Sequence, residues 1–588
     1  MRKKFVFRTE SKWYRGAIKG EMSKLLTTAD PEIGDTHMEK KTVIVALIAM
    51  TIFAAIVILG ESGAPPFELY TIHLGPLTLS TRGHGWVYMR EGEGVLGFLA
   101  AAFLIGSVVF KRRLRTAAFT LLCVTTAAAG ILSIFSVAAL RPQAHDSRDQ
   151  LLYYLGSKYY DEIGYNVLAR CIIEAAWETG VPPPPIYRDQ ATNAVIDSRR
   201  SIAMSEPCRK RFSEKRWEEF KTDVSGFTPA LTAWQGQWQK TLCDHGFNGT
   251  PVVRRLIAAT AKIFPATRRG LTLYAFLNLA AVMLALLAVL KWVGARESAV
   301  CALLIFVYAG DSFIHLWSIP RYFWLSSILV GVSLLYRGGK WAVPVAGAFL
   351  MFSAGLKVFP AAWLAGPALL TAVELIRRNR GDGFRMMTGA AVAGVVLFAW
   401  TVSDAHHLDN WFEFIDRIQQ NGNRATTGCI GFAFNFLRPL PGPDLDLRPM
   451  QAAIHIPRLG PFTLHHFQLL LQVLLSAAVL RACLRIDYAR AAVLSGFGLV
   501  FLWTVPVSYY YAGFLGLPLL FPHARNRVLF TVSSVLLLLM AAVSGMLFER
   551  VIEPILYTAF LSSGFTVFLC FALIALEIER RRARPFFS

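Results

Sequence analysis

Two aspartates, Asp146 and Asp149, stand directly after an apolar run that ends near residue 139, at the start of a long polar segment. Carboxylates at a lipid–water boundary are costly unless they are solvated or used. A carboxylate in this position can take a proton from a sugar hydroxyl or hold a divalent cation. Aspartates are also common as solvated helix caps. The spacing therefore leaves two interpretations, a general base and a cap.

Aromatic and basic side chains follow these aspartates closely: Tyr153, Tyr154 and Lys158 all lie within ten positions of Asp149. Aromatic rings suit stacking on a sugar face or contact with a lipid tail, and a lysine suits an anion. In an active site these three residues would bind substrate. The alternative is an amphipathic helix on the membrane surface, with the tyrosines in the interfacial belt.

A single lysine, Lys357, stands between two apolar runs, three residues before Pro360. An ammonium group in such a position is expected to face a cavity or an anionic partner. A lipid phosphate is a natural counter-ion for this point charge. The alternative is a lysine at a helix end whose side chain snorkels to the head groups.

Two arginines are further candidates for phosphate binding. Arg321 begins an apolar run, where its planar guanidinium could bind phosphate oxygens, or could pair with Asp311 in the preceding link. Arg424 follows Asn423 in a polar stretch rich in hydrogen-bond donors, which suits a phosphate or a sugar.

A turn sequence, Asp244-His245-Gly246-Phe247-Asn248-Gly249-Thr250-Pro251, closes the first polar segment. Asp244 and His245 offer an acid and a base side by side, and Asn248 offers hydrogen bonds to a substrate. The alternative is a structural turn that leads back to the membrane before a helix over residues 252–264.

Composition places these residues in a membrane protein. Of the 588 residues, 54% are hydrophobic and 17% are charged, whereas about a quarter of a soluble domain is charged. The net charge of +21 could suggest a nucleic-acid partner. However, the basic residues stand in short clusters between apolar runs, which is how membrane topology is encoded. We therefore expect a lipid bilayer and no nucleic acid as a partner.

Fourteen apolar runs approach the length of a membrane-spanning helix. A backbone in lipid must satisfy its own hydrogen bonds, which favours helices. The pair of runs around Lys357 could be one broken helix or two half-spans. We predict an all-α polytopic membrane protein with about 13–14 transmembrane helices, over residues 42–60, 94–110, 116–139, 271–290, 297–310, 321–336, 341–356, 358–373, 386–402, 463–480, 491–505, 508–521, 528–546 and 554–576.

The charge of the links alternates along the chain. Six alternate links hold 17 Lys and Arg residues, whereas the short links of the opposite set hold four. The positive-inside rule then predicts that both termini are cytoplasmic, and we expect the inner membrane of a bacterium. The predicted domains are a basic N-terminal segment 1–41, three spans in 42–139, an exterior loop domain 140–270, spans in 271–402, a second exterior loop 403–462, spans in 463–576 and a basic tail 577–588.

The exterior segment 140–270 is too long for a simple connector. We expect a small, mainly helical cap, with amphipathic helices resting on the membrane and Trp217, Trp234 and Trp238 at head-group depth.

Four of the eight cysteines fall in the exterior segments and allow three pairings. Two alternatives remain: a Cys208–Cys243 disulfide, if the compartment is oxidising, or cysteines that are all unpaired. No Cys/His spacing is typical of a zinc site, so no metal ligand is predicted.

Asp149, the run Tyr153-Tyr154-Leu155-Gly156-Ser157-Lys158 and Gly164-Tyr165 resemble the start of the first large exterior loop in the polyprenyl-phosphate-mannose-dependent mannosyltransferases, which have the GT-C fold. The stretch from Gly355 to Pro360 resembles the Lys-x-x-Pro element of the same enzymes. In those relatives the loop usually follows the first span, whereas here it follows the third. The resemblance implies a GT-C-like fold.

The resemblance also implies an activity, the transfer of a hexosyl or pentosyl unit from a polyprenyl-phosphate-linked sugar to an extracytoplasmic lipid, glycan or protein. Asp149, with Asp146 near it, would be the base, and Lys357, Arg321 and Arg424 would neutralise the departing phosphate. Some GT-C enzymes use a divalent cation, and the sequence assigns no cofactor.

Two other classes of protein remain as alternatives. A transporter or flippase of a lipid-linked or small polar substrate would show internal repeats, and the sequence contains no such symmetry. A non-catalytic membrane scaffold would need no acid at the start of the exterior loop.

Overall fold

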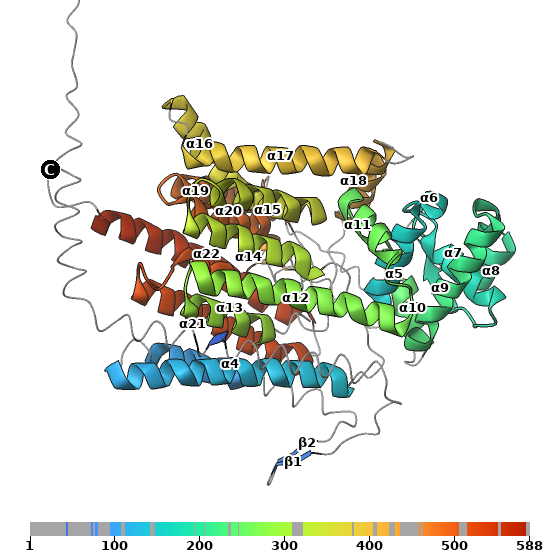
Figure 1. Ribbon diagram of the computed structural model, residues 1–588, viewed down its shortest axis with the longest axis horizontal. Coiled ribbons are helices and arrows are strands. Elements are labelled where there is room, and N and C mark those ends of the chain that lie inside the picture. Colours follow the sequence, from blue (N-terminus) through green and yellow to red (C-terminus); the bar gives the residue numbers. More distant parts are fainter. Residues whose placement is uncertain are drawn as a thin grey trace, which may run out of the picture.

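Long helices run side by side through most of the computed structural model, and a group of shorter helices covers one end of this bundle (Figure 1). The structure describes residues 95–106, 112–140, 147–192, 194–204, 206–232, 237–244, 246–307, 321–378, 381–403, 408–422, 430–435, 464–504, 516–550 and 554–583, together with residues 41, 43–44, 72–74, 77–79, 458–459, 462–463 and 514.

The bundle helices follow the apolar runs of the sequence closely, because a helix satisfies its own backbone hydrogen bonds wherever water is absent. Besides a helix over residues 95–106, they are α4 (Arg112–Leu140), α12 (Arg268–Trp292), α13 (Ala295–Val307), α14 (Arg321–Arg337), α15 (Ala342–Leu356), α16 (Ala362–Ile376), α17 (Asp382–Val402), α19 (Leu464–Cys483), α20 (Tyr488–Trp503), α21 (Arg527–Arg550) and α22 (Pro554–Ala583).

Among the described residues, six helices are long and apolar enough to cross a membrane: Arg269–Trp292, Phe359–Ile376, Asp382–Val402, His466–Cys483, Arg527–Ser544 and Phe560–Arg581. The outer surface of the bundle carries large apolar side chains, and Val395 and Val567 are 68% and 62% exposed. Such a surface suits lipid rather than water. The chain is therefore a mostly helical, polytopic membrane protein. The count of about 13–14 spans stays a prediction, because almost all of segment 42–60 and half of segment 508–521 lie outside the described residues.

The two apolar runs around Lys357 form separate helices. α15 ends at Leu356, and the short 3-10 helix η3 (Phe359–Ala361) leads into α16. α15 packs against α14 and α17, whereas α16 packs chiefly against α20. Lys357 thus lies at a helix end.

The cap contains short helices, one 3-10 turn and a hairpin: α5 (Ser147–Lys158), α6 (Tyr160–Ile163), α7 (Leu168–Glu178), β3 (Ile186–Arg188), β4 (Val195–Asp197), α8 (Ser198–Met204), η1 (Cys208–Arg211), α9 (Glu214–Thr232), α10 (Gln237–Leu242) and α11 (Pro251–Ala261). Two further hairpins pair β1 (Ile72–Leu74) with β2 (Leu77–Leu79) and β5 (Arg458–Leu459) with β6 (Phe462–Thr463).

The cap interior is aromatic, which corrects one prediction. Trp217 is fully buried, with its ring stacked 5.5 Å from that of Phe220, and Trp238 is only 7% exposed. The prediction that these two tryptophans lie at head-group depth is therefore wrong. Both form part of the cap core, because burial of large aromatic rings stabilises a small domain. Trp234 lies outside the described residues.

A disulfide joins Cys171 of α7 to Cys208 of η1. The carboxylate of Glu174 accepts hydrogen bonds from the backbone N–H groups of Cys208 and Arg209, at 2.7 and 3.2 Å. The Cys208–Cys243 pairing is therefore wrong, and Cys243 is a free thiol. A partner 37 residues away reaches Cys208 because α7 packs against η1.

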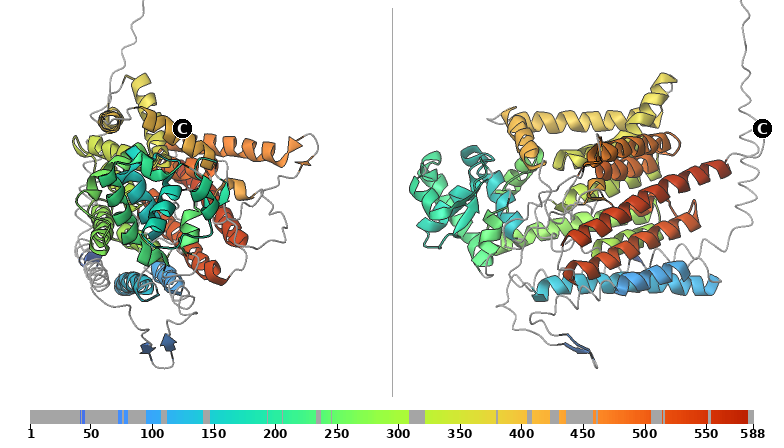
Figure 2. Two further views of the ribbon diagram at one scale, coloured as in Figure 1. Left: turned by 90° about the vertical axis from the view of Figure 1, so that its right-hand side faces the viewer. Right: turned by 180° about the vertical axis from the view of Figure 1, so that it is seen from behind.

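The second predicted exterior segment returns to the same end of the bundle. Its helix α18 (Asp409–Gly422) lies beside the cap, across the direction of the neighbouring α17 (Figures 1 and 2). The Tyr160 hydroxyl donates to Glu413 Oε2 at 2.6 Å, and Arg417 donates to the carbonyl of Gln190 at 2.6 Å. The 3-10 helix η4 (Phe432–Asn435) then contacts α22.

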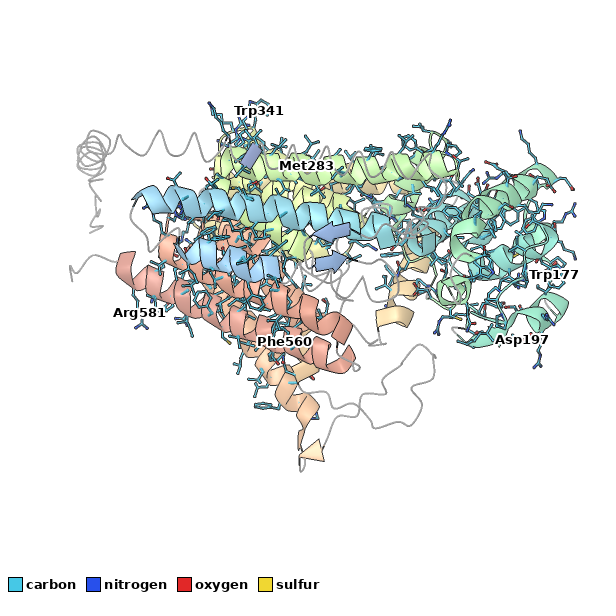
Figure 3. All side chains as sticks on the ribbon, turned by 90° about the horizontal axis from the view of Figure 1, so that it is seen from below. Trp177, Asp197, Met283, Trp341, Phe560 and Arg581 are labelled. Atoms are coloured by element: carbon cyan, nitrogen blue, oxygen red, sulfur yellow. A yellow bond between two sulfur atoms is a disulfide. The ribbon has the colours of Figure 1, made fainter. Side chains whose placement is uncertain are left out.

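The basic links gather at the other end of the bundle. Arg485 pairs with Glu577 at 3.1 Å, which ties the link after α19 to the last turns of α22. Figure 3 shows the labelled Trp341 and Arg581 at this end, far from Trp177 and Asp197 of the cap. We call the two ends of the bundle the cap end and the basic end; the sidedness predicted from the charge of the links stays a prediction.

Candidate functional site

Three of the predicted site residues meet where the cap joins the bundle. The Lys357 ammonium donates a hydrogen bond to the Tyr153 hydroxyl at 2.7 Å. The same hydroxyl donates to Asn248 Oδ1 at 2.6 Å. The three side chains come from α5, from the turn before α11 and from the end of α15. We call this group the junction triad.

The helical geometry of α5 determines which of its two adjacent tyrosines belongs to the triad. Neighbouring residues on a helix point about 100° apart. Tyr153 faces the bundle, whereas the Tyr154 hydroxyl donates to the backbone carbonyls of Phe264 and Ala261, at 3.2 and 3.4 Å. Burial raises the pKa of Tyr154 well above its ordinary value. Tyr154 is thus a neutral core residue of the cap.

Close packing holds the turn that carries Asn248. The backbone of Gly246 has a φ of +74°, and a Cβ there would lie 2.4 Å from the Gln190 amide nitrogen. The Phe247 ring packs against Gly156 of α5, and the Tyr165 hydroxyl donates to the carbonyl of Gly249 at 2.8 Å. The backbone on both sides of Asn248 is therefore fixed.

Thr250 connects this turn to both α11 and α15. Its hydroxyl oxygen accepts from the backbone N–H of Val253, which caps α11. The same hydroxyl donates to the carbonyl of Gly355 at 2.6 Å. The positive end of the α11 helix dipole consequently lies near the end of α15, where Lys357 begins the next segment.

Lys357 leaves α15 in an extended conformation, with φ −144° and ψ 139°. Its ammonium lies 5.1 Å from the centroid of the Tyr153 ring and 2.7 Å from the hydroxyl, so it sits beyond the hydroxyl and bonds to the oxygen, not to the ring face. Lys357 and Asn248 are half-buried, whereas Tyr153 is 7% exposed. The charge is thus partly desolvated but remains reachable from outside.

The order of donors in the junction triad suits an anion. Lysine can only donate, so the Tyr153 proton must point to the Asn248 oxygen. The Asn248 amide nitrogen forms no hydrogen bond with the described residues and keeps its N–H donors. A phosphate oxygen near the triad would meet an ammonium, amide N–H groups and the N-terminus of α11.

Lys158, also predicted to bind substrate, lies in a separate network inside the cap. Its ammonium pairs with Asp223 at 2.6 Å and Glu219 at 2.8 Å. The Tyr159 hydroxyl donates to the same Asp223 oxygen at 2.7 Å. Burial, together with the charges of these carboxylates, raises the pKa of Tyr159 well above its ordinary value. The network joins α5 to α9 and leaves Lys158 away from the junction triad.

Of the remaining predicted residues, only Asp244 has a described side chain. Asp244 is half-buried beyond the end of α10, where its backbone N–H donates to the carbonyl of Thr241 at 3.3 Å. Asp149 is the third residue of α5 and Arg321 is the first of α14; only their backbones are described. Four predicted residues lie outside the described residues: Asp146, His245, Asn423 and Arg424.

Sequence reasoning did not single out Thr250, Gly355 or Glu413. Thr250 before Pro251 is a helix-start signal that could have been read as the cap of α11. No local signal marks the Gly355 carbonyl or Glu413, because their partners are 105 and 253 residues distant in sequence.

No protein-family model matches this sequence, and no curated protein matches it in sequence. In the described part of the chain, no group of three His, Cys, Asp or Glu side chains could hold a metal ion. The class of protein that the fold defines is a helical polytopic membrane protein with a polar site between its cap and its bundle.

Proposed function

We propose that this chain is a membrane glycosyltransferase of the GT-C type, which moves a sugar from a polyprenyl-phosphate donor to an extracytoplasmic lipid, glycan or protein. The single observation that supports the proposal most is the junction triad. It joins the loop that begins near Asp149 to the lysine that interrupts two apolar helices, although 204 residues separate Tyr153 from Lys357.

In the proposed reaction Asp149 is the general base. Residues four apart share a face of a helix, so Asp149 of α5 precedes Tyr153 by one turn. Its carboxylate takes the proton of the acceptor hydroxyl, and the acceptor oxygen forms a bond to the anomeric carbon with inversion. The bond from that carbon to the phosphate oxygen breaks, and the polyprenyl phosphate leaves with the electron pair.

Lys357 would neutralise the charge that develops on the departing phosphate. Tyr153 and Asn248 act as positioning residues, since the Tyr153 hydroxyl holds the ammonium and Asn248 holds the hydroxyl. Arg321 and Arg424 are proposed to complete the phosphate site from neighbouring exterior segments. A donor with a polyprenyl chain would approach through the lipid beside the bundle.

We further propose that the basic end is cytoplasmic and that the cap faces the oxidising side of a bacterial inner membrane. The positive-inside rule supports this orientation, as does a disulfide in the cap. α18 is proposed to lie in the head-group region, because Phe412, Ile415 and Ile418 are 61%, 45% and 41% exposed on this helix.

The test uses the purified full-length protein in lipid nanodiscs and a panel of short-chain polyprenyl-phosphate sugars, with and without Mg²⁺. Mass spectrometry measures the release of polyprenyl phosphate in the presence of membrane-extract acceptors. We expect Asp149→Asn to lower release by at least about a hundredfold, the range of a general base. The matched control is Asp161→Asn, since Asp161 has a side chain that is 69% exposed and lies outside the junction triad.

Wild-type release by the Asp149→Asn variant would remove Asp149 from the mechanism. An equal loss in both variants would show that the effect is not specific to this carboxylate. If the wild-type protein consumes no donor of the panel, the proposed transferase activity fails for those sugars.

A further inference from the structure

A cavity of about 140 Å³ lies at the basic end of the bundle, between the last turns of α19 and α22. Its polar wall contains Arg481, Arg485, Arg580 and Glu577. A single water needs roughly 10–15 Å³ on this scale. The cavity therefore has room for a group of several heavy atoms. Figure 3 labels Arg581, the neighbour of Arg580, at this end of α22.

The charges around this cavity do not balance. Glu577 accepts hydrogen bonds from Arg485 at 3.1 Å, from Arg580 at 2.9 Å and from Arg581 at 3.2 Å. Its carboxylate oxygens are thus occupied by three guanidinium groups. The guanidinium of Arg481, which is exposed, forms no ion pair or hydrogen bond within the described part of the chain. An excess of positive charge and N–H donors is left in the cavity wall.

The other wall of the cavity is apolar and continues onto the outside of the bundle. Leu573, Leu576 and Ile486 line it. On the adjoining surface Ile574 and Ile578, one turn apart on α22, are 61% and 46% exposed. A molecule in this place would meet guanidinium groups at one end and a lipid-facing apolar surface at the other.

We propose that this cavity binds the phosphate head group of an anionic phospholipid from the leaflet at the basic end. Arg481 and Arg485 bind the phosphodiester oxygens, and the acyl chains lie along the exposed apolar face of α22. Basic pockets between transmembrane helices recognise head groups in this way. The apolar continuation favours a lipid over free phosphate. The inference rests on the membrane fold and does not depend on the proposed sugar transfer.

The test is native mass spectrometry of the full-length protein released from mixed micelles that contain phosphatidylglycerol and phosphatidylcholine. We expect the wild-type protein to retain phosphatidylglycerol preferentially. Arg481→Gln should weaken this retention about fivefold and Arg481→Gln with Arg485→Gln about twenty-fivefold, as expected for the loss of one or two surface charges near anionic lipid. Arg481→Lys should keep much of the binding.

The matched control is Arg377→Gln, because Arg377 is an exposed arginine in another link at the basic end. Equal retention of both lipids by the wild-type protein would overturn the proposal. So would an equal loss in the Arg377→Gln variant, because the effect would then be general surface charge. Displacement of phosphatidylglycerol by millimolar inorganic phosphate would assign the cavity to free phosphate instead.

Discussion

The contact between Tyr153 and Lys357 can be measured with a double-mutant cycle. The variants are Tyr153→Phe, Lys357→Met and the two together. The first removes the hydroxyl that joins Lys357 at 2.7 Å to Asn248 at 2.6 Å, and it keeps the ring. Because the ring is kept, the coupling free energy that the cycle measures is the interaction between the Tyr153 hydroxyl and the Lys357 ammonium.

The structure sets the size of the coupling. A hydrogen bond to a charged group contributes about 1.5–3 kcal/mol. Lys357 is half-buried, so water can replace part of the lost contact. We therefore expect a coupling free energy of about 1–2 kcal/mol between Tyr153 and Lys357.

The assay is reversible unfolding of the full-length protein by sodium dodecyl sulfate in mixed micelles, followed by circular dichroism. The control cycle replaces Tyr153→Phe by Tyr154→Phe, because the Tyr154 hydroxyl binds backbone carbonyls inside the cap. Distant sites are usually additive within about 0.5 kcal/mol. A coupling below this value for Tyr153, or an equal coupling for Tyr154, would refute the assignment of the junction triad.

Three further predictions concern the cap. Breaking the bond between Cys171 and Cys208, by Cys171→Ser or by reduction, should destabilise the cap by about 4 kcal/mol in the chain-entropy model for a loop closed across 37 residues; unchanged protease resistance of the cap would contradict this. Gly156→Ala places a Cβ 2.6 Å from the Phe247 ring. The overpacking should outweigh the gain in helix propensity and destabilise the protein by about 1–2 kcal/mol. An unchanged melting temperature would contradict this prediction. Partial burial opposes ionisation of Glu219, but its cationic partners lower its pKa below 4.5. The ionised Glu219 therefore stabilises the cap above the unfolded-state pKa, and this contribution is lost as the pH falls. Glu219→Gln should make cap stability, measured by proteolysis, fall less steeply below about pH 4.

The sequence predicted the helices better than it predicted their partners. The apolar runs at 386–402 and 463–480 correspond to α17 and α19 within a few residues, because lipid forces each segment to satisfy its own backbone groups. The charge of the links predicted on which side of a membrane these segments lie, and that sidedness stays a prediction. Both properties depend on residues that are close together in the chain.

The site was predictable only in part. Lys357 could be identified from the sequence because a charged side chain between apolar runs is costly unless it faces a cavity or a partner. Its partners were not predictable from that signal, since Tyr153 is 204 residues away and Asn248 is a further contact of Tyr153 across 95 residues.

The sequence by itself therefore determined a helical membrane protein, the positions of most described helices and the residue types of a polar junction. The tertiary structure alone decided that Tyr153 rather than Tyr154 faces Lys357, that Cys171 rather than Cys243 binds Cys208, and that Trp217 fills the cap core. Each of these choices depends on which way a side chain turns when distant segments pack together. Hydropathy and charge are properties of single segments, whereas a contact is a property of two.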